Sequence, residues 1–476
     1  MAFALTSCTT RLALVVEPDA RIAWEALIAA HPLPKGIAAS EGTGVDKASN
    51  RLTMTIRRTT TSASSAPGAA SSAPGAASQA RTIIRIPLAP VVPLWDPRQD
   101  IRADSVAGGI ELVRLASIEP PLRALSVDGK YPGDADYPFF EETVLEFRGR
   151  DKWLSAWFLA LPEAADPACP VWVAAVGDIM PARGVDATLM ARGPEAVFGD
   201  TLGILRGSDL VLGNLEAPAS YRGVPASKGY TFRFRPQALD ALKSAGFSYF
   251  SLTNNHCLDY GPEAFLDTLD NLAVRGIATS GAGKDLAAAK RPSVLERKGQ
   301  TFHVYSLGLY PAEGNGWDGR KYAAATETRP GILWADEETK DFLKEHMHAE
   351  SGFRIVMVHG GEEWSRRPTE WFHDLCRELV DMGADVVIGS HPHVLQGMEG
   401  YRGSLIAYSL GNFVFPGMDE MDGGEDSMIL RFGVWNGKIC YIQPVPARLS
   451  GVTVRLNTQP GSGAAILRMS RELSSP

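Results

Sequence analysis

Between residues 171 and 445 the chain alternates short apolar runs with longer stretches in which apolar residues recur every three or four positions. The first pattern predicts buried β-strands and the second predicts amphipathic α-helices. The predicted strands are Val171–Val176, Leu210–Leu212, Tyr249–Leu252, Thr301–Leu307, Ile355–Val358, Val386–Ile388 and Leu405–Ser409, and the predicted helices are Glu195–Leu205, Pro236–Ala245, Pro262–Arg275 and Thr369–Met382. Strands that alternate with helices favour a parallel sheet with helices on its faces.

The last two predicted strands, Met428–Trp435 and Lys438–Val445, are joined only by a short turn. Asn436-Gly437 between them favours a type I′ β-hairpin, because both positions of that turn need a positive φ. Antiparallel strands therefore join the parallel ones, either in a mixed sheet or in two sheets packed between helices. The predicted fold class is α/β.

A polar block ends or follows each of five apolar runs. The polar blocks are Val176–Met180, Gly213–Glu216, Asn254–Asp259, His359–Glu363 and Gly389–His393. Open α/β sheets place their sites at the carboxyl ends of the strands, so we expect the blocks to converge on one crevice. Their Asp, Glu, Asn and His side chains offer the oxygen and imidazole donors that a hard or borderline divalent metal needs.

Each polar block, taken alone, can also be explained without a metal or a ligand. Gly177-Asp178 is an ordinary strand exit, although the glycine would let the backbone approach a ligand closely. His391-Pro392-His393 is the strongest block, because two imidazoles at positions i and i+2 of an extended, proline-stiffened segment face the same way. Four of the nine histidines lie in the polar blocks. This concentration favours one shared metal site over five unrelated loops.

Other chemistries find little support. The sequence contains no Gly-x-Ser-x-Gly elbow of a serine hydrolase. Gly283-Lys284 looks like part of a phosphate-binding loop, but Ala278 stands where the first glycine belongs and Asp285 replaces the final Ser or Thr. Cys257 adjoins a histidine and is better explained as a small buried residue.

Composition narrows the class of partner. The chain has 476 residues, 45% of them hydrophobic, which is enough for two domains. A net charge of -8 with scattered Lys and Arg argues against nucleic acid. No apolar stretch approaches the roughly 20 residues of a membrane-spanning helix. Five widely spaced cysteines indicate neither a disulfide framework nor a Cys-x-x-Cys zinc site.

The residues before 169 are predicted to form a smaller α+β region. Thr82–Pro87 and Val91–Trp95 are expected to be separate strands with proline at their edges. Ser64–Ala70 recurs at once as Ser71–Ala77, a composition too poor in large apolar groups to pack. The predicted divisions are a βα segment at 1–60, a flexible Ser/Ala/Pro/Gly linker at 61–80, the rest of the N-terminal region at 81–168, the main domain at 169–450 and a C-terminal tail at 451–476.

Leu5-Thr6-Ser7-Cys8 resembles the lipobox of a bacterial lipoprotein, in which the cysteine carries the lipid anchor. Only four residues precede it. The expectation of an extracytoplasmic protein anchored in the cell envelope through Cys8 therefore requires a start farther upstream.

Six motifs follow one another between Val171 and Val445: Gly-Asp-Ile-Met, Gly-Asn-Leu-Glu, Asn-Asn-His-x-x-Asp-x-Gly, His-x-Gly-x-Glu, Gly-x-His-Pro-His-Val and Tyr-Ser-Leu-Gly-Asn-Phe. In this order, and with Gly281-Ala282-Gly283 also in place, they resemble the CapA family of poly-γ-glutamate capsule biosynthesis proteins. That family is similar to calcineurin-like metallophosphoesterases. The resemblance implies a four-layer αββα metallophosphatase-like domain, preceded here by the smaller α+β region.

The resemblance also implies a bound divalent metal, which would be Mn, Zn or Fe. The implied metal ligands are Asp178, Glu216, Asn255, His359, His391 and His393. Met180 departs from the metallophosphoesterase pattern, which has a histidine ligand there, and Asn214 replaces the aspartate expected to bridge two metals. Gly360 departs from the CapA pattern, in which Trp is usual. One metal, or a weakly held pair, is therefore as consistent with the sequence as a standard two-metal phosphatase.

The implied function is metal-dependent hydrolysis or group transfer on an anionic envelope polymer, such as poly-γ-glutamate, or on its precursor. His256, oriented by Asp259, would protonate the leaving group. The candidate substrate-binding residues are Asn214, Lys228, Arg233, Glu363 and Asn412. Lys228, Arg233 and Arg235 would receive substrate carboxylates or phosphates, although a solvated hairpin explains them equally well.

Two other functions stay open. A non-catalytic accessory protein would use the same crevice to bind or help export the polymer, alongside other capsule-synthesis proteins. The two missing metal ligands favour this alternative, whereas the His256–Asp259 pair, which binding alone does not need, argues against it. A phosphoesterase of the cell interior fits the incomplete export signal but not the missing ligands.

Overall fold

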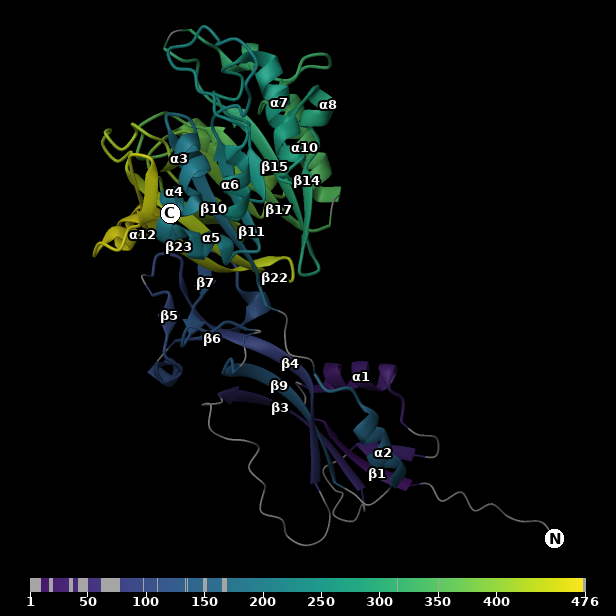
Figure 1. Ribbon diagram of the computed structural model, residues 1–476. Helices are drawn as coiled ribbons and strands as arrows, with labels where there is room; N and C mark the ends of the chain where they lie inside the picture. The colour runs from purple at the N-terminus through teal and green to yellow at the C-terminus, as the bar shows by residue number, and fades with distance from the viewer. Residues whose placement is uncertain are drawn as a thin grey trace, which may run out of the picture. The chain divides into compact units, whose positions relative to one another are not determined.

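The computed structural model describes residues 10–16, 20–33, 37–41, 50–60, 78–96, 98–108, 110–132, 134, 136–148, 152–164, 169–314, 316–349 and 351–473. The chain separates into two compact units (Figure 1). The first unit comprises Met1–Pro90, Asp100–Ser117 and Leu125–Cys169, and the second comprises Val91–Gln99, Ile118–Ala124 and Pro170–Pro476. Two short segments expected in the N-terminal region, 91–99 and 118–124, thus belong to the second unit.

The first unit combines a mixed sheet with two helices. Its elements are β1 (Thr10–Val16), α1 (Arg21–Ala30), β2 (Ile37–Glu41), β3 (Asn50–Thr60), most of β4 (Ser78–Pro93), β5 (Asp100–Ile101), β6 (Leu112–Arg114), β8 (Ser126–Val127), β9 (Phe139–Arg148) and α2 (Lys152–Ala160). The sheet runs β2-β1-β3-β9-β4-β6, with β1 parallel to β2 and β3 and the other pairs antiparallel. Leu27 of α1 and Phe158 of α2 share a core with Phe147 of β9. This is the α+β region expected from the sequence.

One continuous strand, β4, replaces the two strands that were predicted around its prolines. Pro87 is the last residue of β4 that pairs with β9, Pro90 the last that pairs with β6, and Pro93 the last that pairs with β7 (Leu122–Ala124). Proline has no N–H to donate to a ladder, so each proline marks a change of partner within the strand. Residues 61–77 of the predicted linker and Cys8 lie outside the described residues, and Ser78–Ala80 belong to β4.

The second unit contains two large sheets. Its strands are β7, β10 (Val171–Ile179), β11 (Leu210–Leu215), β12 (Tyr249–Ser251), β13 (Ala282–Gly283), β14 (Ser293–Arg297), β15 (Gln300–Leu309), β16 (Gly331–Ile332), β17 (Phe353–Gly360), β18 (Val386–Ser390), β19 (Met398–Tyr401), β20 (Ser404–Ala407), β21 (Asn412–Val414), β22 (Asp426–Trp435), β23 (Lys438–Ser450) and β24 (Thr453–Leu456). One sheet runs β12-β11-β10-β22-β23-β24, with β21 also paired to β10, and the other runs β14-β15-β17-β18-β20-β19. The strands predicted to be parallel are parallel in both sheets.

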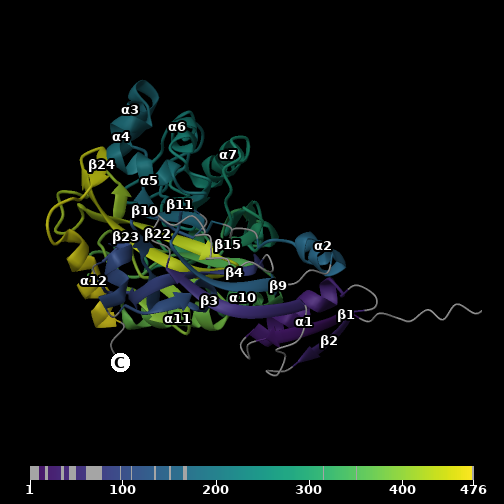
Figure 2. The same ribbon diagram turned by 90° about the horizontal axis from the view of Figure 1, so that it is seen from below.

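Helices cover the outer faces of the two sheets. They are α3 (Val185–Arg192), α4 (Pro194–Phe198), α5 (Leu202–Arg206), α6 (Ala238–Ser244), α7 (Gly261–Ala273), α8 (Leu286–Ala289), α9 (Gly319–Tyr322), α10 (Glu337–Ala349), α11 (Glu370–Asp381) and α12 (Ser462–Leu473). Val173 of β10 and Ile355 of β17 meet in the core between the sheets. Phe265 of α7 packs in a second core with Val211 of β11, and Leu379 of α11 packs in a third with Val387 of β18. The predicted four-layer αββα architecture is confirmed, and Figure 2 shows α6 and α7 on one side of β10 and β11, with α11 on the other.

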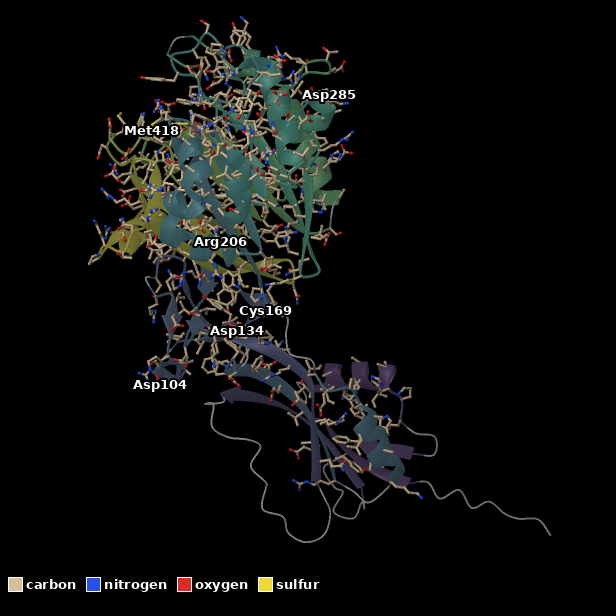
Figure 3. The ribbon with its side chains drawn as sticks, viewed as in Figure 1. Asp104, Asp134, Cys169, Arg206, Asp285 and Met418 are labelled. Atoms are coloured by element: carbon tan, nitrogen blue, oxygen red, sulfur yellow. The ribbon has the colours of Figure 1, made fainter. Side chains whose placement is uncertain are left out.

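Several local predictions change in the structure. The helix expected at 195–205 is divided into α4 and α5, because Gly199 adopts a φ of 48°. The expected C-terminal tail holds β24, which extends a sheet, and α12, which contacts β19 and β23. Asp285, labelled in Figure 3, accepts a hydrogen bond from the Ala288 N–H and so caps α8. Asn436 and Gly437 have φ of 49° and 73°, as a type I′ turn requires.

None of the helices in the described part of the chain combines the length and the apolar character needed to cross a bilayer.

Candidate functional site

Strand register brings the polar blocks together at one edge of the two sheets. Asp178 of β10 pairs with Asn214 of β11 on one side and with Asn412 of β21 on the other. In the second sheet, His359 of β17 pairs with Ser390 of β18. These parallel pairs place the carboxyl ends of neighbouring strands side by side, which is why blocks far apart in sequence meet.

Gly177 is required by a backbone contact, which the sequence did not predict. A Cβ at this position would lie 1.9 Å from the carbonyl oxygen of Gly411. That carbonyl accepts a hydrogen bond from the Asp178 N–H at 3.0 Å. The close approach of the two chain segments sets Asn412 beside Asp178.

The Asn214 amide lies at the centre of the buried cluster. Its Nδ2 is 2.8 Å from Asp178 Oδ1, 3.0 Å from Glu216 Oε2 and 3.2 Å from His359 Nδ1. The residue has no exposed surface. Asn214 therefore links three site residues, and its substrate-binding role stays a prediction.

The buried donors fit a divalent metal. Asp178, Glu216 and His359 each offer a ligand atom, and these atoms lie within 4.8 Å of one another. Glu216 Oε1 and His391 Nδ1 are buried without a hydrogen-bond partner. Unpaired buried polar atoms are costly and call for an explanation. A cation held by these oxygen and nitrogen atoms supplies one, and the donor set suits several borderline divalent metals.

His393 is held in one tautomer by its neighbours. Its Nδ1 lies 2.9 Å from Asn412 Oδ1 and 3.3 Å from Asp178 Oδ2, and both of these atoms are acceptors. Nδ1 therefore carries the proton, which leaves the Nε2 lone pair directed for a metal. His393 Nε2 lies 3.9 Å from Glu216 Oε1. The Asn412 amide also donates to the His393 carbonyl at 2.8 Å, so Asn412 orients His393, and its substrate-binding role stays a prediction.

The His391-Pro392-His393 segment is a tight turn and not the extended segment that was predicted. His391 and His393 have φ of 100° and 59°, in the left-handed region. Such backbone costs on the order of 1–3 kcal/mol for residues other than glycine and clusters at functional sites. The turn points the His391 ring at His359, with 4.8 Å between ring centroids. His359 Nε2 in turn lies 3.0 Å from Asn255 Oδ1.

Asn255 and His391 reach a cleft of about 520 Å³. Its lining residues are Gly229, Tyr230, Asn255, His256, Pro311, Ala312, Glu313, Gly314, Glu362, Glu363 and His391. Three of these carry carboxylates, including the predicted Glu363, and none of the described lining residues is a lysine or an arginine. The cleft is therefore acidic at its wall and rich in imidazole at its inner end.

The His256–Asp259 pair lies on the wall of this cleft. His256 Nδ1 is 2.7 Å from Asp259 Oδ2. Asp259 also accepts hydrogen bonds from the Phe232 N–H at 2.7 Å and from Lys228 Nζ at 2.8 Å. The imidazole is thereby fixed through one nitrogen, which leaves Nε2 available to a ligand.

Lys228, a predicted substrate contact, has a buried side chain and is not part of a solvated hairpin. Its side chain has no exposed surface. The ammonium donates to Asp259, to Glu313 at 2.8 Å and to the Asn255 carbonyl at 2.6 Å, and it lies 4.2 Å from the centre of the Trp317 ring. Lys228 thus ties together the segments that carry Asn255 and Asp259.

The two arginines expected beside the site also point elsewhere. The Arg233 guanidinium lies 4.1 Å from the centre of the Tyr260 ring and donates to the carbonyl of Arg222. Arg235 forms an ion pair with Asp186 at 2.7 Å. Neither arginine lines the cleft. The cationic receptors predicted from the sequence are therefore absent from the described lining.

Burial sets the protonation of the cluster. Burial, followed by the charge of Asp178, raises the pKa of Glu216 well above its usual range. Burial lowers the pKa of His359 and lowers that of His391 to about 3. Burial also acts to lower the pKa of His393, but the hydrogen bond and charge of Asp178 outweigh it, so the pKa is raised. His359 and His391 are thus neutral, the form in which histidine binds metals.

Sequence reasoning missed two residues of the site. Asn254 donates to Asn214 Oδ1 and to the Leu215 carbonyl, both at 2.9 Å, and accepts from the His256 N–H at 3.1 Å. Asn254 lies inside a predicted polar block, but the adjacent Asn255 was taken as the amide ligand and no separate role was predicted for Asn254. The Tyr310 ring packs against His359 and His391, with centroids 5.7 and 5.8 Å apart. No motif marked this tyrosine.

Residues 172–417, more than half of the chain, match the model of the family described as bacterial capsule synthesis protein PGA_cap. The chain belongs to this family. Membership in PGA_cap confirms the resemblance carried by the six motifs.

Named relatives agree with the PGA_cap assignment. The chain is 34% identical over 242 residues to the PGA biosynthesis protein CapA of Bacillus subtilis (strain 168), covering 50% of this chain and 62% of that one. It is 30% identical over 287 residues to a probable polyglutamine synthesis accessory protein of Mycobacterium tuberculosis (strain CDC 1551 / Oshkosh), covering 55% and 72%. The chain therefore matches less than two thirds of the Bacillus subtilis relative.

Solved structures are more distant from this PGA_cap protein. A 5'-nucleotidase from Candida albicans SC5314 aligns at a TM-score of 0.34 and 10% identity, over 64% of this chain and 58% of that one. That likeness is too weak to carry an argument. The αββα assignment rests on strand order and on the three cores described above.

Proposed function

We propose that this chain is a metal-dependent hydrolase or transferase that acts on an anionic envelope polymer such as poly-γ-glutamate, or on its precursor. The observation that carries the proposal is the His256–Asp259 pair on the wall of the cleft that Asn255 and His391 also line. A proton-transfer pair beside a buried set of metal donors is what metal-assisted bond cleavage needs. The polymer is suggested by the name of the Bacillus subtilis relative.

The residues that would hold the ion are Asp178, Glu216, Asn255, His359, His391 and His393. A divalent ion bound there would lower the pKa of a coordinated water towards ~7 and polarise the scissile group. Asn412 fixes the His393 tautomer for this task, and the unpaired oxygen of Glu216 is a free ligand atom. Manganese, zinc and iron all suit this donor set.

His256 is the proposed proton donor to the leaving group. Asp259 accepts from Nδ1, so Nε2 is the atom that would carry the proton to substrate. Burial lowers the pKa of His256, although the hydrogen bond to Asp259 opposes this shift. Lys228 and the Phe232 N–H hold Asp259 in place, which keeps the imidazole oriented.

The charge of the cleft supports a role for a cation. Glu313 is paired with Lys228, but Glu362 and Glu363 would repel a polyanion, and no lysine or arginine occurs among the described lining residues. An anionic chain would therefore bind in the cleft only when an ion at the inner end offsets these carboxylates. Substrate affinity in the cleft should follow metal occupancy.

The test is metal content, measured by inductively coupled plasma mass spectrometry, beside release of glutamate from poly-γ-glutamate. His391→Ala removes a proposed ligand, and His348→Ala removes an exposed histidine of α10 as a matched control. We expect near-stoichiometric metal in the wild type and the control, and loss of metal with at least about a 100-fold fall in rate in His391→Ala. Unchanged activity in His391→Ala would contradict the proposal.

A second candidate is a non-catalytic accessory protein that binds or helps export the polymer. Two observations favour it: the Asn214 amide occupies the centre of the donor cluster, and Met180 contributes a buried thioether where a histidine was expected. The name of the Mycobacterium tuberculosis relative also contains the word accessory. In that case the wild type would bind polymer yet take up no metal on reconstitution.

The proposal places the protein at the cell envelope, outside the cytoplasm, where other capsule-synthesis proteins would be its partners. The proposed anchor is a lipid on Cys8. Mass spectrometry of the native N-terminus tests this part, since an unmodified Met1 or Ala2 would contradict it.

A further inference from the structure

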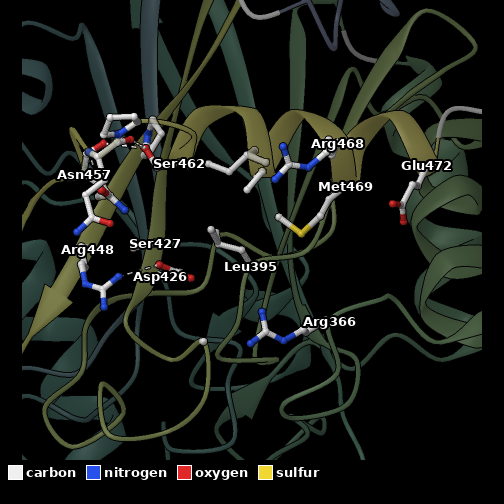
Figure 4. A pocket seen from close by; sticks show the side chains of 17 residues that line it. Arg366, Leu395, Asp426, Ser427, Arg448, Asn457, Ser462, Arg468, Met469 and Glu472 are labelled. Atoms are coloured by element: carbon white, nitrogen blue, oxygen red, sulfur yellow. Dashed lines mark hydrogen bonds and ion pairs between the residues drawn. The ribbon is translucent and has the colours of Figure 1, made fainter.

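A second cavity, of about 450 Å³, lies within the second unit under α12 (Figure 4). We call it the arginine groove, because Arg366, Arg448 and Arg468 line it. Arg366 comes from the loop after β17, Arg448 from β23 and Arg468 from α12. Figure 4 shows Arg468 and Arg366 on opposite sides, with Leu395 between them. Three distant parts of the sequence therefore deliver guanidinium groups to one groove.

The arginines of the groove are available to a ligand. Arg366 pairs with Asp422 at 3.0 Å, but the two side chains are 57% and 95% exposed. Arg448 pairs with Glu425 at 3.1 Å and with Asp426, another lining residue, at 3.5 Å, also near the surface. Exposed ion pairs are worth about 0–1 kcal/mol, so a carboxylate from a ligand can replace them. Arg468 forms no ion pair with any residue that the structure describes.

The floor of the groove combines apolar surface with one unused polar group. Leu395, Ile466 and Met469 supply the apolar part. Ser427 also lines the groove, and its hydroxyl is buried without a hydrogen-bond partner. A buried hydroxyl in this state is free to bond a ligand. No aromatic ring that could stack on a base occurs among the lining residues described.

We propose that the arginine groove binds a chain that carries spaced carboxylates on an aliphatic backbone, such as a run of γ-linked glutamate. Guanidinium groups recognise carboxylates through paired hydrogen bonds, and the apolar floor suits the methylene groups between them. The identity of the polymer rests on the proposed function, whereas the groove itself does not. The groove supplies the cations that the acidic cleft lacks.

Two loops connect the groove with the cleft. In the first, Glu362 and Glu363 line the cleft and Arg366 lines the groove. In the second, His391 lines the cleft and Leu395 lines the groove. A polymer held by the arginines therefore contacts the same loops that carry the cleft residues. The groove holds the chain, and the cleft receives the bond that reacts.

The test is binding of a fluorescein-labelled decamer of γ-linked glutamate to the full chain, followed by fluorescence anisotropy at low salt. Arg468→Gln removes a groove cation, and Arg471→Gln removes a cation of the same helix that does not line the groove. We expect Arg468→Gln to weaken binding about 10-fold, as loss of a charge-assisted hydrogen bond does, and Arg471→Gln to change it less than about 2-fold.

Further results decide the proposal. His391→Ala should leave decamer affinity unchanged, which separates the groove from the metal site. Equal weakening by Arg468→Gln and Arg471→Gln, or equally tight binding of polyphosphate, would overturn the proposal. Loss of binding in His391→Ala with none in Arg468→Gln would also overturn it and leave the proposed function standing. If the protein binds the decamer but has neither metal nor activity, the proposed polymer-binding groove would be supported and the proposed enzymatic function would be refuted.

Discussion

The cleft and the arginine groove differ in almost every chemical respect, although they lie in the same unit and share two loops. The cleft is lined by three glutamates and ends in buried imidazoles. The groove is lined by three arginines and two acidic residues, Asp426 and Glu472, over an apolar floor. One cavity is built to hold a cation and the other to hold an anion. Under the proposed function, this contrast separates the binding of the polymer from the reaction on it.

The largest expected effect concerns Lys228, the cation buried behind the cleft. Lys228→Met removes one partner of a buried ion pair and leaves Asp259 and Glu313 uncompensated. We expect the free energy of unfolding to fall by about 3–5 kcal/mol, measured by urea denaturation. Lys284→Met, which changes an exposed lysine outside this network, is the control and should change it by less than about 0.5 kcal/mol. Equal stability of Lys228→Met and wild type would show that the cleft wall does not depend on this network.

The next effect tests the close contact beneath the cluster. In Gly177→Ala the new Cβ meets the Gly411 carbonyl, which is backbone and cannot move aside easily. We expect a loss of about 2–3 kcal/mol in stability, seen as a lower midpoint of thermal unfolding. Gly203→Ala in α5, where a Cβ meets nothing within 4 Å, should instead raise stability by up to about 1 kcal/mol. A midpoint for Gly177→Ala at or above that of Gly203→Ala would contradict the assigned role of Gly177.

An effect of intermediate size is expected when one asparagine beside the metal site and one asparagine of the groove are replaced in turn. Asn412→Ala removes the acceptor that fixes His393 Nδ1, so we expect metal affinity to fall about 10-fold. Asn457→Ala changes an asparagine that lines the groove and should leave metal affinity unchanged. Competition with a chelator measures both. If the two variants lose metal equally, the tautomer argument for His393 is wrong.

The smallest effect concerns the acidic wall. Glu363→Gln removes a charge that repels a polyanion, so decamer affinity should rise by about 2-fold at low salt and return to the wild-type value at high salt. Arg468→Gln should move affinity in the opposite direction. A fall in affinity for Glu363→Gln would mean that the cleft carboxylates attract the polymer, and the contrast between the cavities would then need revision.

The site could be foreseen where it depends on strand ends. Asp178, Asn214 and His359 follow apolar runs, and parallel pairing alone carries them to one edge. The four layers follow from the same alternation of strands and helices.

Features that depend on distant or unusual contacts could not be foreseen. Lys228 lies in a polar stretch typical of a solvated hairpin, and two carboxylates farther along the chain, Asp259 and Glu313, compensate its charge when it is buried. The positive φ of His391 and His393 contradicts the extended conformation that the intervening proline suggests. The arginine groove has no motif, because its three arginines come from separate elements.

The two shared loops have a consequence for how the protein would be regulated. A ligand that shifts these loops from one cavity alters affinity in the other, and thermodynamic linkage makes the factor identical in both directions. Because decamer affinity is expected not to change in His391→Ala, which loses the metal, this factor is expected to be close to one. Metal would then bind equally well to the free and to the polymer-bound protein, so the supply of the ion and the supply of the chain would act independently.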